Sequence, residues 1–371
     1  CRAMLADSAR IQEADARHLN KRREPGERRV EPIYTQEDVE QAIEQFVTHP
    51  YRKEFDAAPG VVATFRDAGH ILGSAGVLLE PSQGPSIYFT GDLGRPMYPI
   101  LRDPEPLPDV DVVLSECTYG MREHEPVDLA EEKLRAIVQR AIDRKGKVFI
   151  PAFSVGRTQN LVYALAGMRR AKTIPPIAVV VDSPLAEKAT RVFAEHPECY
   201  DAEVREFQSD GGRPFYPRWL HYTRDRAESI ALNHAEGPLI IISASGMCEG
   251  GRIAHHLKHG LADGRNTVLF VGWQAPYTLG RRIVEGNKQV RVLGRKVRVR
   301  ADIESLRAYS AHAGRSELIE FLAPAAERQS DVYLVHGDED TAVGFAETLR
   351  LEGIERVTVP ERMVTYDLEQ R

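Results

Sequence analysis

The stretch Val113-Leu114-Ser115-Glu116-Cys117-Thr118-Tyr119-Gly120 joins a short apolar strand to a carboxylate and then to small residues. Four other stretches also place a histidine or an acidic residue beside small residues: Asp67-Ala68-Gly69-His70-Ile71-Leu72-Gly73-Ser74, Tyr88-Phe89-Thr90-Gly91-Asp92, Ser310-Ala311-His312-Ala313-Gly314 and Leu334-Val335-His336-Gly337-Asp338. One such motif is more typical of a turn than of a ligand. Five of them predict a metal site, because strand ends in α/β folds place side chains in a shared cleft. Histidine and carboxylate groups there suit zinc.

Strands and helices alternate along the chain from about residue 127 onwards. This alternation predicts βαβ units and a parallel sheet. Upstream, residues 61–65, 76–79, 86–89 and 110–114 have the pattern of strands joined by loops. The polar span 197–231 has no clear periodicity, so we expect an irregular excursion or a long loop there. The chain is therefore expected to be of the α/β class.

The charge of the chain is uneven. The net charge is −6, which argues against a protein that coats nucleic acid non-specifically. Basic residues nevertheless cluster at Lys21-Arg22-Arg23 and again over residues 288–300, where valines alternate with arginines on both sides of Leu293-Gly294. That alternation predicts a β-hairpin with one basic face. The face is either solvated or turned towards phosphates, and the sequence leaves both interpretations open.

Cysteine content and hydropathy indicate the cellular setting. The four cysteines form no C-x-x-C pair and are too few for a disulfide scaffold. We therefore expect reduced thiols and a cytoplasmic protein. The apolar runs are strand-sized and far shorter than the roughly 18 residues that a membrane span requires, so we expect no membrane partner.

As an ordered set, the five motifs resemble those of the metallo-β-lactamase superfamily. The resemblance is strongest to its β-CASP branch of nucleic-acid nucleases, which includes the cleavage and polyadenylation endonuclease and its bacterial and archaeal relatives. Further matching stretches are Pro151-Ala152-Phe153-Ser154-Val155-Gly156-Arg157-Thr158-Gln159, Asp182-Ser183-Pro184 and the segment from Ala244 to Arg252. The resemblance implies a four-layer αββα sandwich with an inserted β-CASP α/β domain. It assigns residues 1–122 and 290–371 to the sandwich and residues 123–289 to the insert.

The resemblance also implies the roles of the five motif residues. His70 corresponds to a ligand of the first of two zinc ions, Asp92 to a carboxylate that bridges both ions, and His336 to a ligand of the second. Glu116 and His312 correspond to the paired acidic residue and histidine that mark the branch. A carboxylate bonded to an imidazole fixes its tautomer, so a charged His312 would be able to protonate the departing oxygen.

Contacts to substrate phosphates are expected from a further group of residues on motif loops. Backbone amides and small hydroxyls allow close approach, and arginine pairs with phosphate oxygens in a bidentate manner. Each residue has an alternative role in capping or packing. The group comprises Ser154, Arg157, Ser245, Gly246, Arg252, Ser310 and Gly314.

One motif of the family is missing. His-x-His-x-Asp-His should lie upstream of His70 and supply four more ligands, but none of the twelve histidines forms it. Without it each zinc has two protein ligands, whereas a catalytic zinc takes three and a water. We therefore expect an N-terminally incomplete sandwich that is inactive by itself. A degenerate paralogue is the other interpretation.

The expected function is that of a zinc-dependent phosphodiesterase that hydrolyses RNA in RNA processing or decay. An endonuclease is expected, and an additional 5′-3′ exonuclease mode is left open. The alternatives are a catalytically inactive RNA-binding or scaffold paralogue and a small-molecule metallo-hydrolase. The last is disfavoured because such enzymes lack the large insert and the Glu116–His312 pair. The expected partner is single-stranded RNA, and a preference for DNA and a homodimer are both left open.

Overall fold

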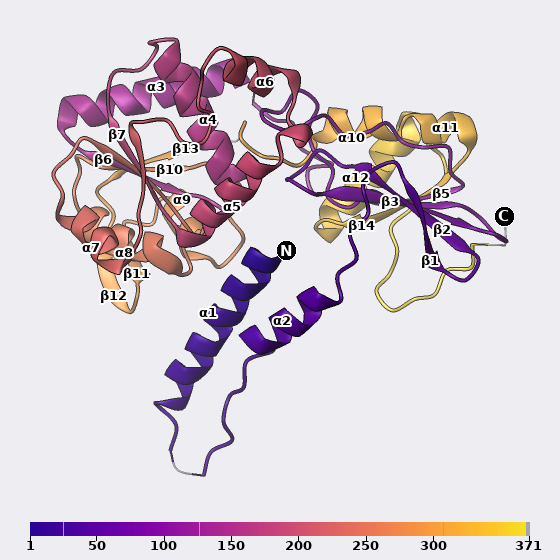
Figure 1. Ribbon diagram of the computed structural model, residues 1–371, viewed down its shortest axis with the longest axis horizontal. Coiled ribbons are helices and arrows are strands. Elements are labelled where there is room, and N and C mark those ends of the chain that lie inside the picture. Colours follow the sequence, from indigo (N-terminus) through magenta and orange to yellow (C-terminus); the bar gives the residue numbers. More distant parts are fainter. Residues whose placement is uncertain (25, 126, 307, 369–371) are drawn as a thin grey trace.

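The computed structural model describes residues 1–24, 26–125, 127–306 and 308–368, the side chains of residues 127 and 128 excepted. Figure 1 shows two α/β bodies side by side and a helical arm that projects away from them. One body is built on a seven-stranded sheet and the other on a six-stranded sheet. None of the helices in the described ranges is long and apolar enough to cross a membrane.

The seven-stranded sheet has the order β1-β2-β3-β4-β5-β14-β15. Strands β4, β5, β14 and β15 are mutually parallel, and β3 runs antiparallel to both β2 and β4. Strands β2, β4, β5 and β14 therefore end at the same edge of the sheet. The strands are β1 (Glu54–Ala58), β2 (Val61–Asp67), β3 (Ala75–Pro81), β4 (Ile87–Phe89), β5 (Val112–Glu116), β14 (Asp331–His336) and β15 (Val357–Thr358).

One face of this sheet forms a core with helices α10 (Arg315–Leu322), α11 (Pro324–Arg328) and α12 (Glu339–Leu351). Tyr88 and Val113 pair across β4 and β5 and are fully buried in that core. On the opposite face, Phe89 and Val335 keep 43% and 42% of their surface exposed. Within the described ranges, the expected four-layer sandwich is thus represented by one sheet and one helical layer.

The second body has a parallel six-stranded sheet of order β13-β10-β6-β9-β7-β8. This topology confirms the βαβ pattern that the sequence predicts. The strands are β6 (Lys147–Pro151), β7 (Ala178–Asp182), β8 (Leu220–Tyr222), β9 (Leu239–Ser243), β10 (Thr267–Phe270) and β13 (Asp302–Ser305).

Helices pack on both faces of the six-stranded sheet because its central strands are apolar at consecutive positions, so that both faces are apolar. Side chains such as Ile150 and Ile242 pack against α3 (Val127–Arg144), α4 (Arg157–Arg170) and the start of α5 (Pro184–Glu195). On the other face, Phe149 and Ile241 pack against α8 (Gly251–Gly260) and α9 (Leu279–Val284).

The predicted basic hairpin forms strands β11 (Gln289–Val292) and β12 (Arg295–Arg298). Val290 and Val292 are buried in the same core as α8 and α9. Because β13 pairs with β10 in parallel, the six-stranded body continues to Ser305. The expected domain boundary between residues 289 and 290 therefore precedes the end of this body.

The expectation of a long loop over residues 197–231 is wrong. The span contains a 3₁₀ turn (Pro197–Cys199), α6 (Ala202–Ser209), β8 and the start of α7 (Arg226–His234). The Asp201 side chain accepts a hydrogen bond from Val204 N at 2.7 Å, and Asp225 accepts one from Glu228 N at 2.9 Å. The two helices thus begin at aspartate N-caps, a signal that the periodicity argument overlooked.

The helical arm consists of α1 (Arg2–Asn20) and α2 (Gln36–Glu44), which pack against each other in antiparallel orientation. A capping box between Thr35 and Asp38 starts α2. Ala9 and Val39 are buried, and the start of α1 lies beside α5 (Figure 1). In residues 1–122, which the family resemblance assigns to the sandwich, the helical arm comes first and β1 is the first strand of the sheet.

Candidate metal centre

Four of the five motif residues lie at one edge of the seven-stranded sheet because their strands end there. Asp92 and His70 lie in the loops after β4 and β2, and Glu116 and His336 are the last residues of β5 and β14. His312 reaches the same edge on the segment that returns from β13 to α10. The structure therefore brings together all five residues that the sequence singles out.

Asp92 lies between two imidazoles. His70 Nε2 is 3.7 Å from Asp92 Oδ2, and His336 Nε2 is 3.6 Å from Asp92 Oδ1. Both distances are too long for a hydrogen bond. They are close to the separation of about 3.4 Å that two ligands adopt around a tetrahedral zinc with bonds of about 2.0–2.1 Å. One imidazole faces each carboxylate oxygen, which is the arrangement that a bridging carboxylate requires.

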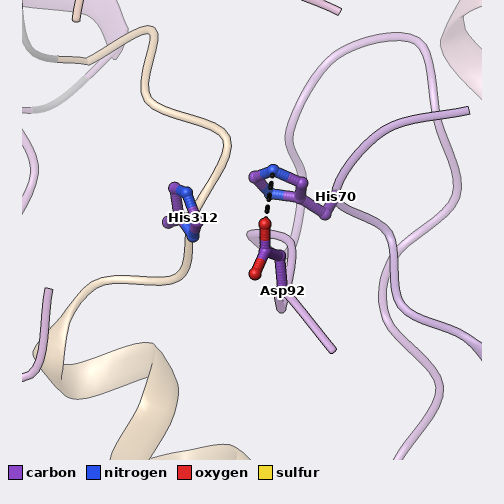
Figure 2. A group of neighbouring side chains, drawn as sticks. All are labelled: His70, Asp92 and His312. Carbon is purple, nitrogen blue, oxygen red and sulfur yellow. Dashed lines mark ion pairs between the residues drawn. The ribbon is translucent and has the colours of Figure 1, made fainter. Parts of the chain in front are cut away.

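The donor set fits zinc chemistry, and His312 is part of the same cluster. Ligand atoms of His70, Asp92 and His312 lie within 4.8 Å of one another (Figure 2). Burial lowers the pKa of His70, and the neighbouring positive charge of His312 lowers it further. A lowered pKa favours the neutral imidazole, which is the form that binds a metal.

The ligand count is incomplete in the described part of the chain. His70 faces one oxygen of Asp92, and His336 faces the other. A catalytic zinc takes three protein ligands. The residues present therefore have the donor chemistry of zinc, but an ion on either side of Asp92 would have only one imidazole and one carboxylate oxygen of this set as ligands.

Glu116 and His312 form a hydrogen-bonded pair beside the metal-facing residues. His312 Nδ1 lies 3.0 and 3.2 Å from the two Glu116 oxygens. Glu116 also accepts hydrogen bonds from Leu93 N at 2.6 Å and Thr118 N at 3.3 Å, and its side chain is fully buried. The geometry fixes the proton on Nδ1 of His312 and leaves Nε2 for chemistry.

Electrostatics favour the ionised form of both groups. Burial raises the pKa of Glu116, but hydrogen bonds and the charge of His312 outweigh burial and hold the pKa below its usual value. Burial likewise lowers the pKa of His312, but the hydrogen bond and charge of Glu116 outweigh it and raise the pKa. The histidine is thus equipped to act as a proton donor.

Comparison with known proteins identifies the family. Residues 158–283 match the family model of the Beta-Casp domain, and residues 296–360 match that of the Zn-dependent metallo-hydrolase RNA specificity domain. The chain is 36% identical over 325 residues to ribonuclease TTHA0252 of Thermus thermophilus, a match that covers 88% of this chain and 74% of that protein. This chain belongs to the β-CASP family of metallo-hydrolases.

Two archaeal β-CASP relatives are named transcription termination factor FttA. The chain is 32% identical over 323 residues to the protein of Methanosarcina mazei. That match covers 84% of this chain and 50% of the Methanosarcina protein. The chain is 30% identical over 329 residues to the protein of Pyrococcus abyssi, with 86% and 50% covered. The chain thus spans about half the length of these two proteins. Membership of the family confirms the predicted fold class and makes the chain a metal-dependent hydrolase.

Arg157 is a predicted phosphate contact of the β-CASP chain that lies beside the loop carrying His70. It is the first residue of α4, after Gly156, whose φ is 76°. A Cβ on Gly156 would lie 3.2 Å from Ile71, so the start of α4 packs on the loop that carries His70. One terminal nitrogen of Arg157 is buried without a hydrogen-bond partner in the described residues. Its charge opposes protonation of His312.

Other predicted phosphate contacts of the β-CASP chain are engaged within the protein. Ser154 Oγ lies 3.0 Å from Ser183 Oγ, and Arg252 donates to Asp182 at 2.6 Å. The backbone N–H of Gly314 donates to Glu317 at 2.6 Å, in the capping box of α10.

The last three predicted contacts lie on the loops after β9 and before α10. Ser310 is buried. Ser245 is half-buried and Gly246 is buried, and their carbonyl oxygens accept hydrogen bonds from Cys248 N at 3.2 Å and Gln274 Nε2 at 3.1 Å respectively. These bonds use the carbonyls and not the groups that would bind phosphate. A phosphate contact by Ser245 or Gly246 stays a prediction.

Two residues near the β-CASP site were missed by the sequence reasoning. His124 Nε2 lies 2.9 Å from the carbonyl oxygen of His312. Arg95 donates to the Ala308 carbonyl oxygen at 2.8 Å and forms an ion pair with Glu317 at 3.1 Å. Both brace the segment that carries His312. They come from loops without a periodic pattern, and nothing in the sequence marks them.

Proposed function

We propose that this chain carries the catalytic residues of a ribonuclease that hydrolyses phosphodiester bonds with two zinc ions. The observation that supports this function best is the position of Asp92, which has one imidazole at each oxygen and lies beside the hydrogen-bonded Glu116–His312 pair. A phosphodiesterase needs both parts, a group that activates water and a group that protonates the leaving oxygen.

The residues divide the work as follows. His70, Asp92 and His336 would hold the ions. Bound zinc supplies hydroxide at neutral pH and neutralises charge on the phosphate. Glu116 retains the proton on Nδ1 of His312, and His312 then donates its Nε2 proton to the oxygen that leaves. Arg157 is placed to pair with a phosphate oxygen.

The proposed substrate is single-stranded RNA. RNA is supported by the description of the family model that matches residues 296–360, which is an RNA specificity domain, and by a relative that is named a ribonuclease. We propose endonucleolytic cleavage, with a 5′-3′ exonuclease mode as the second option. A cytoplasmic location is consistent with four cysteines that are all free. A homodimer stays a prediction.

An inactive RNA-binding scaffold is the second candidate function. It is favoured by one observation, namely that the described residues supply two ligands for each ion instead of three. The two candidates differ in whether the protein retains zinc and cleaves RNA.

The test measures bound zinc and cleavage of single-stranded RNA. Asp92→Ala should lose zinc and activity together, because Asp92 serves both ions. His312→Ala should retain zinc and lose activity by about 10²–10⁴-fold, the usual contribution of a positioned acid. Asp109→Ala is the matched control, since Asp109 is an exposed carboxylate paired with Arg328 outside the site.

The outcomes separate the candidates. Loss of zinc in His312→Ala would make His312 a metal ligand and refute its role as a proton donor alone. RNA binding by the unaltered protein without zinc or cleavage would favour the scaffold. Full activity in Asp92→Ala would contradict the assignment of the metal centre.

A further inference from the structure

A basic groove lies between the end of α8 and the hairpin strand β12. We define it by Lys258, His259, Arg295, Lys296, Arg298 and Arg300, which line a cavity of about 460 Å³ together with Ala262 and Val297. No acidic side chain lines this cavity. His259 also lines a second cavity of about 370 Å³, so the two hollows adjoin.

The positive charge of the groove is concentrated and uncompensated. Residues 288–300 contain six lysines and arginines and no acidic residue, in a chain whose net charge is −6. None of the five lysine and arginine side chains of the groove forms an ion pair with a described residue. Burial lowers the pKa of His259, and the nearby charges of Lys258 and Arg295 contribute to the same shift. Cations that lack internal partners are available to an external anion.

The hairpin presents these cations on a fixed framework. Val290 and Val292 on β11 are buried, and Val297 on β12 packs against the same core. The backbone N–H of Arg300 donates to the Leu261 carbonyl at the end of α8 at 2.8 Å. The two walls of the basic groove are therefore joined by the core beneath it and by a main-chain hydrogen bond.

The basic groove is separate from the metal centre. It is built from segments that precede β10 and β13, whereas His312 lies on the segment that follows β13. In Figure 1 the hairpin lies at the far side of the six-stranded body from β14 and α10. The groove lies at the end where the strands of that sheet begin, and His312 lies beyond the end where β13 finishes. Strands of four or five residues are roughly 13–17 Å long, at about 3.3 Å per residue.

We propose that the basic groove is a second binding site for RNA, which holds the phosphate backbone away from the cleavage site without reading its sequence. The identity of the polyanion as RNA rests on the proposed function. Phosphate binding requires only spaced cations, and these are what the groove offers. A protein partner would instead need an apolar or aromatic centre, and the groove has only Ala262 and Val297 as apolar lining. An RNA held at both sites binds more tightly because its second contact is intramolecular.

The test compares two triple variants in RNA binding. Lys258→Gln/Arg295→Gln/Arg298→Gln removes three cations from the groove, and Lys21→Gln/Arg22→Gln/Arg23→Gln removes three exposed cations from the arm. Fluorescence anisotropy with an oligouridylate of about 16 nucleotides, the upper end of common site sizes, measures affinity across a salt series. The slope of log K against log salt should fall by about 2 in the groove variant, at about 0.7 per lost phosphate contact. The arm variant should keep the slope of the unaltered protein.

Further variants make the result decisive. Arg295→Lys/Arg298→Lys keeps the charge of the groove and should therefore retain the slope. This variant shows whether a smaller slope results from lost charge or from a changed structure of the hairpin. The difference between the two triple variants should persist when each also carries Asp92→Ala, so that the test of this site does not depend on cleavage. Equal losses in both triple variants, or an unchanged slope in the groove variant, would overturn the proposal. Tighter binding of an oligoglutamate of equal charge than of RNA would assign the groove to acidic protein segments and would overturn it too.

Discussion

Replacement of Asp182 by alanine should destabilise the six-stranded body strongly. Asp182 is the last residue of β7 and has no exposed surface. Its carboxylate accepts four hydrogen bonds, each of 2.6 Å, from Thr223, Ser229, Arg252 and His256. The substitution leaves the fully buried His256 and the largely buried Arg252 without their carboxylate partner.

The magnitude follows from burial. Removal of one partner of a buried ion pair costs about 3–5 kcal/mol. At about 2–4 °C per kcal/mol for a body of this size, the midpoint of unfolding should fall by roughly 6–20 °C. Asp210→Ala is the matched control, because Asp210 contacts Arg170 at 2.8 Å but their side chains are 55% and 41% exposed. Exposed pairs contribute about 0–1 kcal/mol, so the control should shift the midpoint little.

The effect should also depend on pH. Burial raises the pKa of Asp182, but the hydrogen bonds from His256, Ser229, Thr223 and Arg252 outweigh burial and hold it far below its usual range. A depressed pKa contributes stability that is present above the unfolded value of about 3.9 and is lost as the pH falls below it. Unfolding followed by circular dichroism should therefore show the full difference between variant and unaltered protein at neutral pH and a smaller one in acid. A shift no larger than that of Asp210→Ala, or a difference that does not shrink in acid, would refute the reasoning.

Two further predictions concern the metal centre. Gly94→Ala should weaken zinc binding by about 10–100-fold, as for other changes that displace a ligand, because its Cβ would lie 2.1 Å from the Gly69 carbonyl and 2.6 Å from His70 N. Competition titration with a chelator measures this, and Gly272→Ala, where a Cβ meets no atom within 4 Å, should bind zinc normally. Glu116→Gln should lower cleavage by about 10–100-fold, since a hydrogen bond to a charged group contributes about 1.5–3 kcal/mol. It should also lower the pKa of His312, which NMR titration of its ring reports, and an unchanged titration would contradict the role of Glu116.

The grouping of the motif residues could be predicted because it depends on strand ends. Asp92, Glu116 and His336 lie within three residues of the end of an apolar run, and parallel strands bring such positions to one edge. The role of the Arg252 side chain could not be predicted in this way. Its partner Asp182 lies 70 positions earlier, and a side chain suited to phosphate is equally suited to a buried carboxylate. Only the folded structure distinguishes the two roles.

The domain order along the chain has a consequence for synthesis. Glu116 and His312 are 196 positions apart, and β5 finds its neighbour β14 only after the whole six-stranded body has been made. Domains fold as units while the chain emerges from the ribosome, beginning at its N-terminal end. A nascent chain that has reached α9 thus holds Asp92 and Glu116 without either of the later histidines. A ribonuclease built in this order cannot cut its own messenger until the segment after β13 has been synthesised.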